Sequence, residues 1–368
     1  KKAVSIPVGA VTYMDPARDP EFFESLIASG ELDFILMNRP LSVDYDYLHK
    51  LEEGRIDEIR PCTRCMHCHW DAADDGNLTF SCRTNAAHPF RFVTGQLTGS
   101  YDPEPAATAK NVVVVGAGPA GLEAARVAAE RGHSVTLYEK KGSVGGLLEF
   151  ANNVKGPHEN LSVLRSYFER QMEVLGVNVM LNTEATADII AEASPDIVIA
   201  ATGGVRDTLG LSDTAGTKVV GIDDFMMADI AEEVVIVGSN VQAIDAAMYL
   251  LAQGKHVQVV TPNAASAIGA GHSFWVKTFT QPNMKALGVR FWPEATVTAV
   301  NDGSVTVKTA TGIEQEIACG TVVEALDCLP NDNLSTGLSC EVVTVGDAAR
   351  PFNIGEAICS GNAAARAI

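Results

Sequence analysis

From residue 111 onward the chain alternates between continuous apolar runs and segments with apolar residues at helical spacing. The runs are 111–115, 134–138, 197–200 and 234–237. Unbroken apolar strands are typical of parallel sheets, because helices cover both faces of such a sheet. The pattern therefore predicts an α/β protein whose later part consists of strand–turn–helix units.

The region before residue 61 shows a shorter version of the same alternation. Apolar runs at 4–11 and 32–37 predict strands, and apolar residues at helical spacing predict helices at 19–30 and 45–53. Strand–helix–strand units imply parallel strands with helical crossovers, but two such strands cannot close a barrel. We therefore expect residues 1–60 to be an incomplete part of a larger β/α structure.

Length and charge narrow the functional classes. The 368 residues are enough for two or three domains, and the formal net charge is −19. Nucleic acids and anionic membranes bind clustered Lys and Arg, so we expect neither as a partner. No apolar run reaches the roughly 18 residues of a membrane-spanning helix. A small-molecule substrate is the expected partner, and a homo-oligomer is compatible with these totals.

Half of the eight cysteines fall in one short window. They are Cys62, Cys65, Cys68 and Cys82, with the spacing C-x2-C-x2-C-x13-C. Four clustered thiolates are the ligands of a 4Fe-4S cluster. A structural zinc site also takes four cysteines, but it usually pairs two separated knuckles, whereas here three thiols lie close together. The spacing favours iron and sulfur, and His67, His69 and His88 remain unassigned.

The remaining cysteines bear on the cellular compartment. They are Cys319, Cys328, Cys340 and Cys359. A chain of this length without a secretory signal is not typical of a disulfide framework, and Pro7 and Asp15 interrupt the apolar residues after Lys1-Lys2. Free thiols beside a cluster predict a reducing environment, so we expect a cytoplasmic protein.

A glycine-rich turn follows the apolar run at 111–115. Gly116, Gly118 and Gly121 form G-x-G-x-x-G before an Ala-rich helix, and Glu139 ends the next strand. These glycines permit a tight bend, a close approach of a pyrophosphate and close helix packing, while the helix N-terminus attracts phosphates. Glu139 falls where a carboxylate holds ribose hydroxyls. The order of strand, turn, helix, strand and acid predicts a dinucleotide site.

A second strand–turn–helix unit begins near residue 231. It comprises the run at 234–237, a helix at 241–251 and a strand at 256–260. Gly238 opens the turn, and Asn240 and Ala243 replace its second and third glycines. We expect the turn to survive, because asparagine tolerates a left-handed backbone and alanine is small.

This second unit is interpreted as the nicotinamide nucleotide site, with a relic fold that binds nothing as the alternative. Thr261-Pro262 ends its second strand and offers neither an acid for a ribose 2′-hydroxyl nor an arginine for a 2′-phosphate. The missing basic residue favours NADH over NADPH. Further along, Asn301-Asp302-Gly303 joins two β runs between 297 and 307 and predicts a hairpin.

Several segments resemble one known family. They are Ile6-Pro7-Val8, Ile27-Ala28-Ser29-Gly30, Asn38-Arg39-Pro40-Leu41 and residues 55–62. They resemble the last two β/α units of the old yellow enzyme-like flavin barrel, which leads into an iron–sulfur segment in the 2,4-dienoyl-CoA reductase and trimethylamine dehydrogenase family. The likeness continues through the cysteines into both nucleotide units. It implies the C-terminal part of an NADH:flavin oxidoreductase, with only about a quarter of the eight-stranded barrel.

The resemblance implies an α/β fold made of the end of a (β/α)8 barrel, a cysteine-rich cluster segment and two nested Rossmann-like dinucleotide-binding domains. The expected regions are 1–60 for the end of the FMN barrel, 61–105 for the iron–sulfur segment, 106–230 with 341–368 for the FAD-binding domain, and 231–340 for the NAD(P)H-binding domain. In this nested arrangement the second nucleotide unit interrupts the first, and the hairpin belongs to a meander of the nicotinamide domain.

The resemblance also assigns cofactor residues. Asp347 resembles the residue that binds the flavin ribitol, Gly145-Gly146 resembles the segment that brings backbone close to FAD, and Arg39 resembles an FMN-phosphate arginine. The positions expected at FAD are Gly116, Gly118, Ala120, Gly121, Glu139, Lys140, Gly146, Leu147, Gly203 and Asp347. Those expected at NAD(P)H are Gly238 and Asn240.

The implied function is electron transfer from NAD(P)H through FAD and a 4Fe-4S cluster to FMN, which reduces an activated C=C bond of an enone or an enoate or enoyl compound. The family's proton donor belongs to the part of the barrel outside this chain, so no catalytic acid is assigned. One alternative is an amine dehydrogenase of the same family, which keeps ADP where FAD would lie. Another is a reductase subunit that docks on a separate barrel chain, and a cleaved barrel portion would serve the same purpose.

Overall fold

The computed structural model describes residues 1–11, 13–69, 71–72, 78–79, 81–88, 99–159, 161–334 and 337–368. The segment expected at 61–105 therefore lies partly outside the described residues, whereas its four cysteines lie within them. None of the described helices combines the length and apolarity that crossing a membrane requires.

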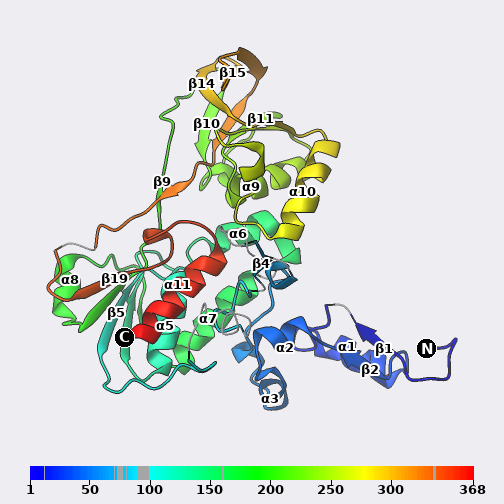
Figure 1. Ribbon diagram of the computed structural model, residues 1–368, viewed down its shortest axis with the longest axis vertical. Coiled ribbons are helices and arrows are strands. Elements are labelled where there is room, and N and C mark those ends of the chain that lie inside the picture. The colour runs from blue at the N-terminus through cyan, green and yellow to red at the C-terminus, as the bar shows by residue number, and fades with distance from the viewer. Residues whose placement is uncertain are drawn as a thin grey trace.

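A five-stranded parallel sheet forms the first nucleotide unit (Figure 1). Its strands, in order, are β19 (Glu341–Thr344), β8 (Ile197–Ala200), β5 (Asn111–Val115), β6 (Ser134–Tyr138) and β7 (Asn178–Met180). Val112 and Val114 face helices α5 (Pro119–Glu130), α7 (Leu161–Val174) and α11 (Ile354–Ala367) in one core. Val113 and Val115 face the opposite side, which helix α8 (Ala187–Glu192) covers. Burial on both faces explains why Val112–Val115 of β5 and all of β8 are apolar.

The second nucleotide unit has its own parallel sheet. Its strands, in order, are β10 (Lys218–Gly221), β17 (Thr321–Glu324), β11 (Glu233–Val237), β12 (His256–Val260) and β13 (Arg290–Trp292). Helix α9 (Val241–Ala252) packs on one face, and helix α10 (Phe274–Ala286) lies beside it (Figure 1). The other face packs on an antiparallel meander of β14 (Ala295–Asn301), β15 (Ser304–Thr309) and β16 (Glu314–Ala318). The predicted hairpin is confirmed, since Asn301 pairs with Ser304 across the turn.

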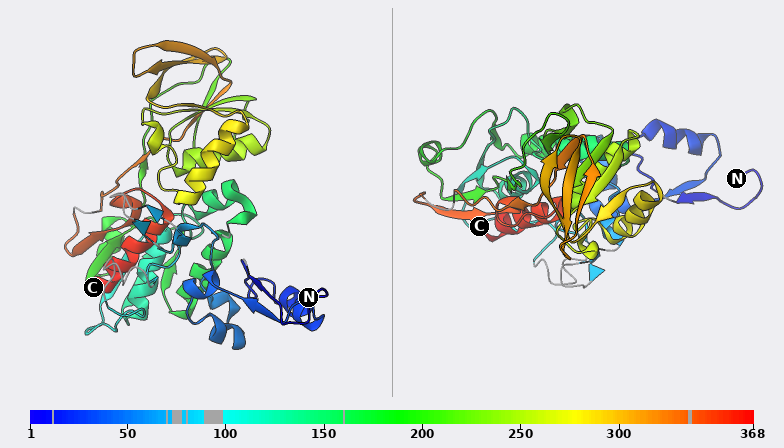
Figure 2. Two further views of the ribbon diagram at one scale, coloured as in Figure 1. Left: turned by 45° about the vertical axis from the view of Figure 1, so that its right-hand side comes forward. Right: turned by 90° about the horizontal axis from the view of Figure 1, so that it is seen from above.

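Two crossing segments join the units. The chain leaves the first sheet after β8 through β9 (Val205–Arg206) and returns through β18 (Cys328–Leu329). These short strands are antiparallel, with Arg206 opposite Cys328, and Figure 2 shows them together between the units. The second unit is therefore an insertion within the first, and the predicted α/β class with Rossmann-like units is confirmed.

The N-terminal region projects from this body as an arm (Figures 1 and 2). It contains β1 (Gly9–Val11), α1 (Pro20–Ala28), β2 (Phe34–Leu36), α2 (Arg39–Val43) and α3 (Tyr47–Glu52). Strands β1 and β2 are parallel, as predicted, but are shorter than the apolar runs. Helix α2 was not expected; Pro40 is accommodated in its first turn, where no backbone N–H is needed. The two strands of the arm form no barrel by themselves.

A buried carboxylate connects the segment that follows the arm to the first nucleotide unit. Glu123, in helix α5, is completely buried and accepts hydrogen bonds from Arg60 Nη2 at 3.2 Å, Arg126 Nη2 at 2.9 Å and Asn362 Nδ2 at 2.8 Å. Burial alone would raise the pKa of Glu123, but the guanidinium groups of Arg126 and Arg60 lower it to about 2. Three segments distant in sequence therefore meet at one charge.

We expect Glu123→Gln to lower the free energy of unfolding by about 3–5 kcal/mol, because it leaves two buried guanidinium groups without their carboxylate. Urea unfolding followed by circular dichroism measures this. The control is Glu130→Gln, which removes another partner of Arg126 whose side chain is 37% exposed; about 1 kcal/mol or less is expected there. Equal losses in the two variants would contradict the prediction.

The same carboxylate gives a pH dependence with a defined sign. Its folded-state pKa of about 2 lies below the ordinary value of 4.5, so its stabilising contribution is complete above about pH 4.5 and is lost as the pH falls towards 2. The difference in unfolding free energy between wild type and Glu123→Gln should therefore shrink between pH 5 and pH 2. A difference that stays constant over this range would exclude the lowered pKa.

Candidate functional site

The turn after β5 has the close contacts that a dinucleotide turn needs. A Cβ atom at Gly121 would lie 1.9 Å from the carbonyl oxygen of Gly116, so helix α5 can pack on this turn only with glycine there. Gly118 is the N-cap of α5 and has open space where a side chain would project. The N-terminus of α5 therefore faces free space across a bare backbone, as the binding of a pyrophosphate requires.

Glu139 is held over this turn. Its carboxylate is buried and accepts hydrogen bonds from the backbone N–H groups of Ala117 and Lys141, both at 2.8 Å. The side chain of Lys140 is exposed. The acid at the end of β6 is thus fixed beside the glycine turn, in the place where a ribose hydroxyl would be bound.

Two further backbone segments close around the turn. Gly145 donates its N–H to the carbonyl of Ala117 at 2.8 Å, and the Cβ position of Gly146 lies 3.0 Å from the Cα of Gly118. Leu147 follows as the N-cap of helix α6 (Leu148–Lys155). After β8, Gly203 turns the chain with a φ of +75° towards the crossing strand β9.

Asp347 reaches the same edge of the sheet from the far end of the sequence. It lies in the short helix η6 (Gly346–Ala348) after β19, and Gly346 packs against Ala120 of α5. Burial raises the pKa of Asp347, while the N–H of Phe352 and the charge of Arg206 oppose this shift. The structure therefore brings the predicted positions from Gly116 to Asp347 to one sheet edge, and their contacts with FAD remain predictions.

The second turn is built differently from the expectation. Gly238 is required, because a Cβ atom there would lie 2.0 Å from the carbonyl oxygen of Ala325. The turn is preserved, as expected, but not through a left-handed backbone at Asn240, whose φ is −70°. Asn240 instead caps helix α9, since its side chain accepts the N–H of Ala243 at 2.9 Å and donates to the carbonyls of Ala325 and Leu326 at 3.1 Å. The two turns therefore differ: Gly118 leaves the N-terminus of α5 bare, whereas the Asn240 side chain occupies one N–H group at the N-terminus of α9.

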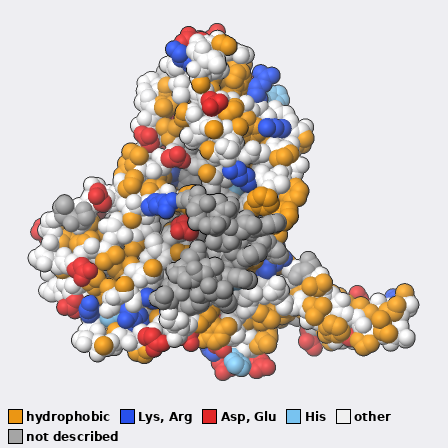
Figure 3. Space-filling model, viewed as in Figure 1, with side chains coloured by type: hydrophobic (Ala, Val, Ile, Leu, Met, Phe, Trp, Pro, Cys, Tyr) orange, Lys and Arg blue, Asp and Glu red, His pale blue; other side chains and the backbone are white. Residues whose placement is uncertain are grey.

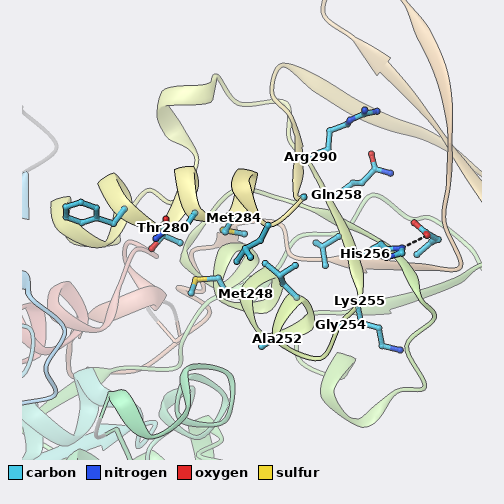
Figure 4. A pocket seen from close by; sticks show the side chains of 16 residues that line it. Met248, Ala252, Gly254, Lys255, His256, Gln258, Thr280, Met284 and Arg290 are labelled. Atoms are coloured by element: carbon cyan, nitrogen blue, oxygen red, sulfur yellow. Dashed lines mark hydrogen bonds and ion pairs between the residues drawn. The ribbon is translucent and has the colours of Figure 1, made fainter.

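A cavity of about 820 Å³ lies elsewhere on the second unit (Figure 4). Its lining includes Met248 of α9, Met284 of α10, and His256 and Arg290 at the starts of β12 and β13. These are the amino ends of the strands, whereas nucleotides in open α/β sheets bind at the carboxyl ends. We therefore do not assign the nucleotide to this cavity.

The four predicted cluster cysteines gather beside the arm. Cys62 and Cys82 are buried and pack with Val43, and the hydroxyl of Tyr13 donates to the carbonyl of Cys62 at 2.9 Å. Burial, and after it the neighbouring thiols, raises the pKa of Cys62 and Cys68 to about 12. Among the residues that the structure describes, no three His, Cys, Asp or Glu side chains converge on a single metal-ion position.

Arg39 faces this cysteine segment. Its Nη1 lies 3.4 Å from the sulfur of Met66, its guanidinium lies 5.0 Å from the centre of the Tyr13 ring, and its charge opposes the raised pKa of Cys62 and Cys68. The residue predicted at an FMN phosphate is therefore adjacent to the predicted cluster ligands. Its contact with FMN remains a prediction.

Sequence reasoning missed a buried ion chain between the cysteine segment and the second unit. It runs through Arg83, Glu159, Lys155, Asp245 and His272. Lys155 Nζ lies 3.3 Å from Glu159 and 2.8 Å from Asp245, and His272 Nε2 lies 3.1 Å from Asp245. Burial would raise the pKa of Glu159, but Arg83 and Lys155 lower it to about 2. No local sequence pattern reveals these ion pairs, because their residues come from four separate segments of the polypeptide.

The fold and the two glycine-containing turns are those of an α/β protein with two dinucleotide-binding units. Residues 110–347 match the pyridine nucleotide-disulphide oxidoreductase family, and the chain belongs to this family. All eight cysteines lie in the described part of the chain, and none of them forms a disulfide.

Three similar proteins have known names. The NADH oxidase of Thermoanaerobacter brockii is 36% identical over 266 residues, which are 71% of this chain and 39% of that protein. The cinnamate reductase of Clostridium sporogenes is 34% identical over 262 residues, which are 71% of this chain and 37% of that protein. A solved complex of 2-naphthoyl-CoA reductase with 2-naphthoyl-CoA has a TM-score of 0.81 at 31% identity and covers 95% of this chain and 53% of that chain. The chain thus spans about half or less of each of these proteins.

Variants of Gly118 and Gly121 test whether the first turn binds a dinucleotide. We expect Gly118→Ala to leave the unfolding free energy within about 1 kcal/mol of wild type, because nothing lies near its Cβ position. Its FAD affinity should nevertheless fall on the order of tenfold, because the methyl group blocks the approach of the pyrophosphate. Flavin titration by fluorescence, together with thermal unfolding, measures both.

Gly121→Ala is the companion variant. Its methyl group meets the carbonyl of Gly116, so we expect a loss of about 1–3 kcal/mol of stability as well as weaker flavin binding. If Gly118→Ala binds FAD as tightly as wild type, the turn is not the site of a pyrophosphate.

Proposed function

We propose that this chain is the NAD(P)H-oxidising and electron-transferring part of an iron–sulfur flavoprotein that reduces an activated C=C bond. In this proposal NAD(P)H binds at the turn of Gly238, FAD at the turn of Gly116, and a 4Fe-4S cluster at the four cysteines. When bound, FAD accepts a hydride and releases single electrons, and the cluster passes them on towards FMN. The protein's own task is to position these groups and to exclude water around them.

One observation supports the electron path most directly. Cys62 and Cys82 pack with Val43 at the junction of the arm and the first nucleotide unit, and Arg60 fixes this junction by its contacts with Glu123. Arg39 belongs to the arm, Cys62 to the junction and Glu123 to the FAD helix α5. A cluster held there would lie between the two flavin-type sites that the sequence predicts.

The donor set fits a cluster better than a single zinc ion. Zinc holds four sulfurs at about 2.3 Å from one centre, whereas each thiolate of a cubane binds a different iron and the sulfurs stand further apart. The described cysteines are close enough to raise one another's pKa. Three of the four lie within seven residues, whereas zinc sites usually pair two separated knuckles, so the spacing favours a cluster.

The substrate class is proposed from the names of two relatives. Cinnamate and 2-naphthoyl-CoA both carry a carbonyl group conjugated to carbon–carbon double bonds. An α,β-unsaturated or aromatic acyl compound is therefore the proposed substrate class. The reacting site itself would lie in a barrel, of which β1 and β2 would be two strands.

The proposed partner of the arm is the remainder of that barrel, as part of the same protein or as a separate chain. The arm exposes several large apolar side chains, and Figure 3 shows them gathered along it. They are Val4, Ile6, Val11, Phe22, Ile27, Phe34 and Leu36. Further parallel strands beside β1 and β2 would cover such residues. Hydrogen exchange should show slow exchange of the β1 and β2 amides only when the complete barrel is present.

An amine dehydrogenase of the same family is the second candidate, and the identity of the extracted nucleotide separates the two. The close approach of Gly146 to Gly118 and the position of Asp347 favour a complete flavin over ADP. Acid extraction followed by chromatography should yield one FAD per chain. One ADP per chain without FAD would exclude the reductase proposal.

A reductase subunit that docks on a separate barrel chain is the third candidate. It shares NADH oxidation with the main proposal, so the chain alone should reduce an artificial dye with NADH after cluster reconstitution. Failure with every dye acceptor would contradict both, and would leave a nucleotide-binding module with a zinc site.

Cysteine variants test the cluster by metal content. Anaerobically purified protein should carry about four irons per chain, and Cys82→Ala should lose nearly all of them while keeping its flavin. The control is Cys319→Ala, which removes a buried thiol in the second unit and should retain the iron. Elemental analysis with flavin absorbance measures both variants. One zinc per chain in wild type would replace the cluster by a structural metal site.

A further inference from the structure

Arg206 is an arginine that the sequence reasoning did not use. It lies in the crossing strand β9, directly after the turn of Gly203, and is the only arginine between Arg170 and Arg290. Its guanidinium forms two bonds with the carboxylate of Asp223, from Nε at 2.9 Å and from Nη2 at 2.6 Å. This pair fixes the plane of the guanidinium and directs its remaining nitrogen away from Asp223.

That remaining nitrogen points to the second nucleotide turn. Nη1 of Arg206 donates to the amide oxygen of Gln242 and to the sulfur of Cys328 at 3.1 Å. Gln242 is the second residue of helix α9, whose N-cap is Asn240. The cation therefore lies at the first turn of the helix that follows Gly238, and that turn contains no acidic residue.

In this type of fold the pyrophosphate of a bound dinucleotide lies at the N-terminus of the helix after the turn. Both present partners of Nη1 are neutral groups, and both are weaker acceptors than a phosphate oxygen. Asp223 neutralises the guanidinium through Nε and Nη2. Nη1 forms no bond with Asp223, so it can exchange Gln242 or Cys328 for another acceptor. The side chain is 24% exposed, so a ligand can reach it.

We propose that Arg206 binds the pyrophosphate of the nicotinamide nucleotide, exchanging the amide of Gln242 for a phosphate oxygen. This inference rests on the proposed NAD(P)H site and adds to it a charged residue that neither turn contains. Because Arg206 belongs to the strand that pairs with Cys328, the contact would also connect the nucleotide to the crossing strands between the two units.

The position of Arg206 relative to the predicted FAD site has a second consequence for nucleotide binding. Arg206 is close enough to Asp347 for its charge to oppose the raised pKa of that carboxyl group. The same cation therefore lies between the predicted FAD ribitol residue and the NAD(P)H turn. A nucleotide held by Arg206 would have its pyrophosphate on the side of the second unit that faces the flavin.

The experiment compares ligands with and without a pyrophosphate on the flavin-loaded protein. In Arg206→Gln we expect Kd for NADH and for ADP-ribose to rise about 10- to 100-fold, while binding of adenosine, measured as a competitor, changes less than twofold. The dependence of the NADH Kd on salt concentration should also become weaker, because one ionic contact is lost. Arg206→Lys should recover part of the affinity, since lysine also binds phosphate.

Two controls keep the outcome decisive. Arg290→Gln removes an arginine of the same unit that lies over the ring of Trp292 at the amino end of the sheet, and it should leave all three affinities unchanged. If Arg206→Gln does not fold, Arg206→Lys serves instead: it should weaken binding of NADH and ADP-ribose but not of adenosine, and equal affinities for all three would contradict the role of Arg206.

The outcomes separate this inference from the proposed function. An unchanged NADH Kd in Arg206→Gln, or an equal loss for adenosine, would overturn the role of Arg206 and leave it as a support of the crossing strands. A wild-type protein that binds neither NADH nor ADP-ribose would contradict the proposed NAD(P)H site itself. Selective loss for the two pyrophosphate ligands supports both.

Discussion

The packing of the first nucleotide unit against its neighbouring segments depends on the hydrogen bonds and ion pairs of the Glu123 carboxylate. It lies on the helix that starts at the first dinucleotide turn, and it accepts hydrogen bonds from Arg60 and from Asn362 of the last helix. Removing such a charge from water is costly unless its partners surround it, and here two guanidinium groups and an amide do so. The hydrogen bonds to Glu123 therefore fix the relative position of the cysteine segment, helix α5 and the C-terminal helix.

A second set of buried charges holds the inserted unit against the cysteine segment. In the buried series from Arg83 to His272, Glu159 lies between the cations of Arg83 and Lys155, and Asp245 lies between Lys155 and the His272 ring. Its first member directly follows Cys82 in sequence, and Asp245 belongs to the helix that begins at Asn240. The predicted cluster ligands and the predicted NAD(P)H helix are thereby held in one continuous polar structure, which adds to the apolar packing of Phe150 and Val154 of helix α6 against the core of the second unit.

The sequence was informative where local physics decides the structure. Strands β6, β8 and β12 begin and end at the predicted residues, and β8 is apolar throughout because it is buried along its whole length. In the arm, β1 and β2 are shorter than their runs, because a strand extends only as far as its neighbour allows. Asn240 was placed correctly in the turn but with the wrong physical role, since its side chain caps the helix. Arg206 and Glu123 could not be found, because their partners lie in other segments and no local pattern records such pairs.

The pairing of β9 with β18 has a mechanical consequence. Both covalent connections to the inserted unit pass side by side through one ladder of two residues on each strand. A rotation of the inserted unit about this ladder would separate Lys155 from Asp245, and each of these buried charges would lose a partner. The ion pair therefore opposes any hinge motion at the paired connections.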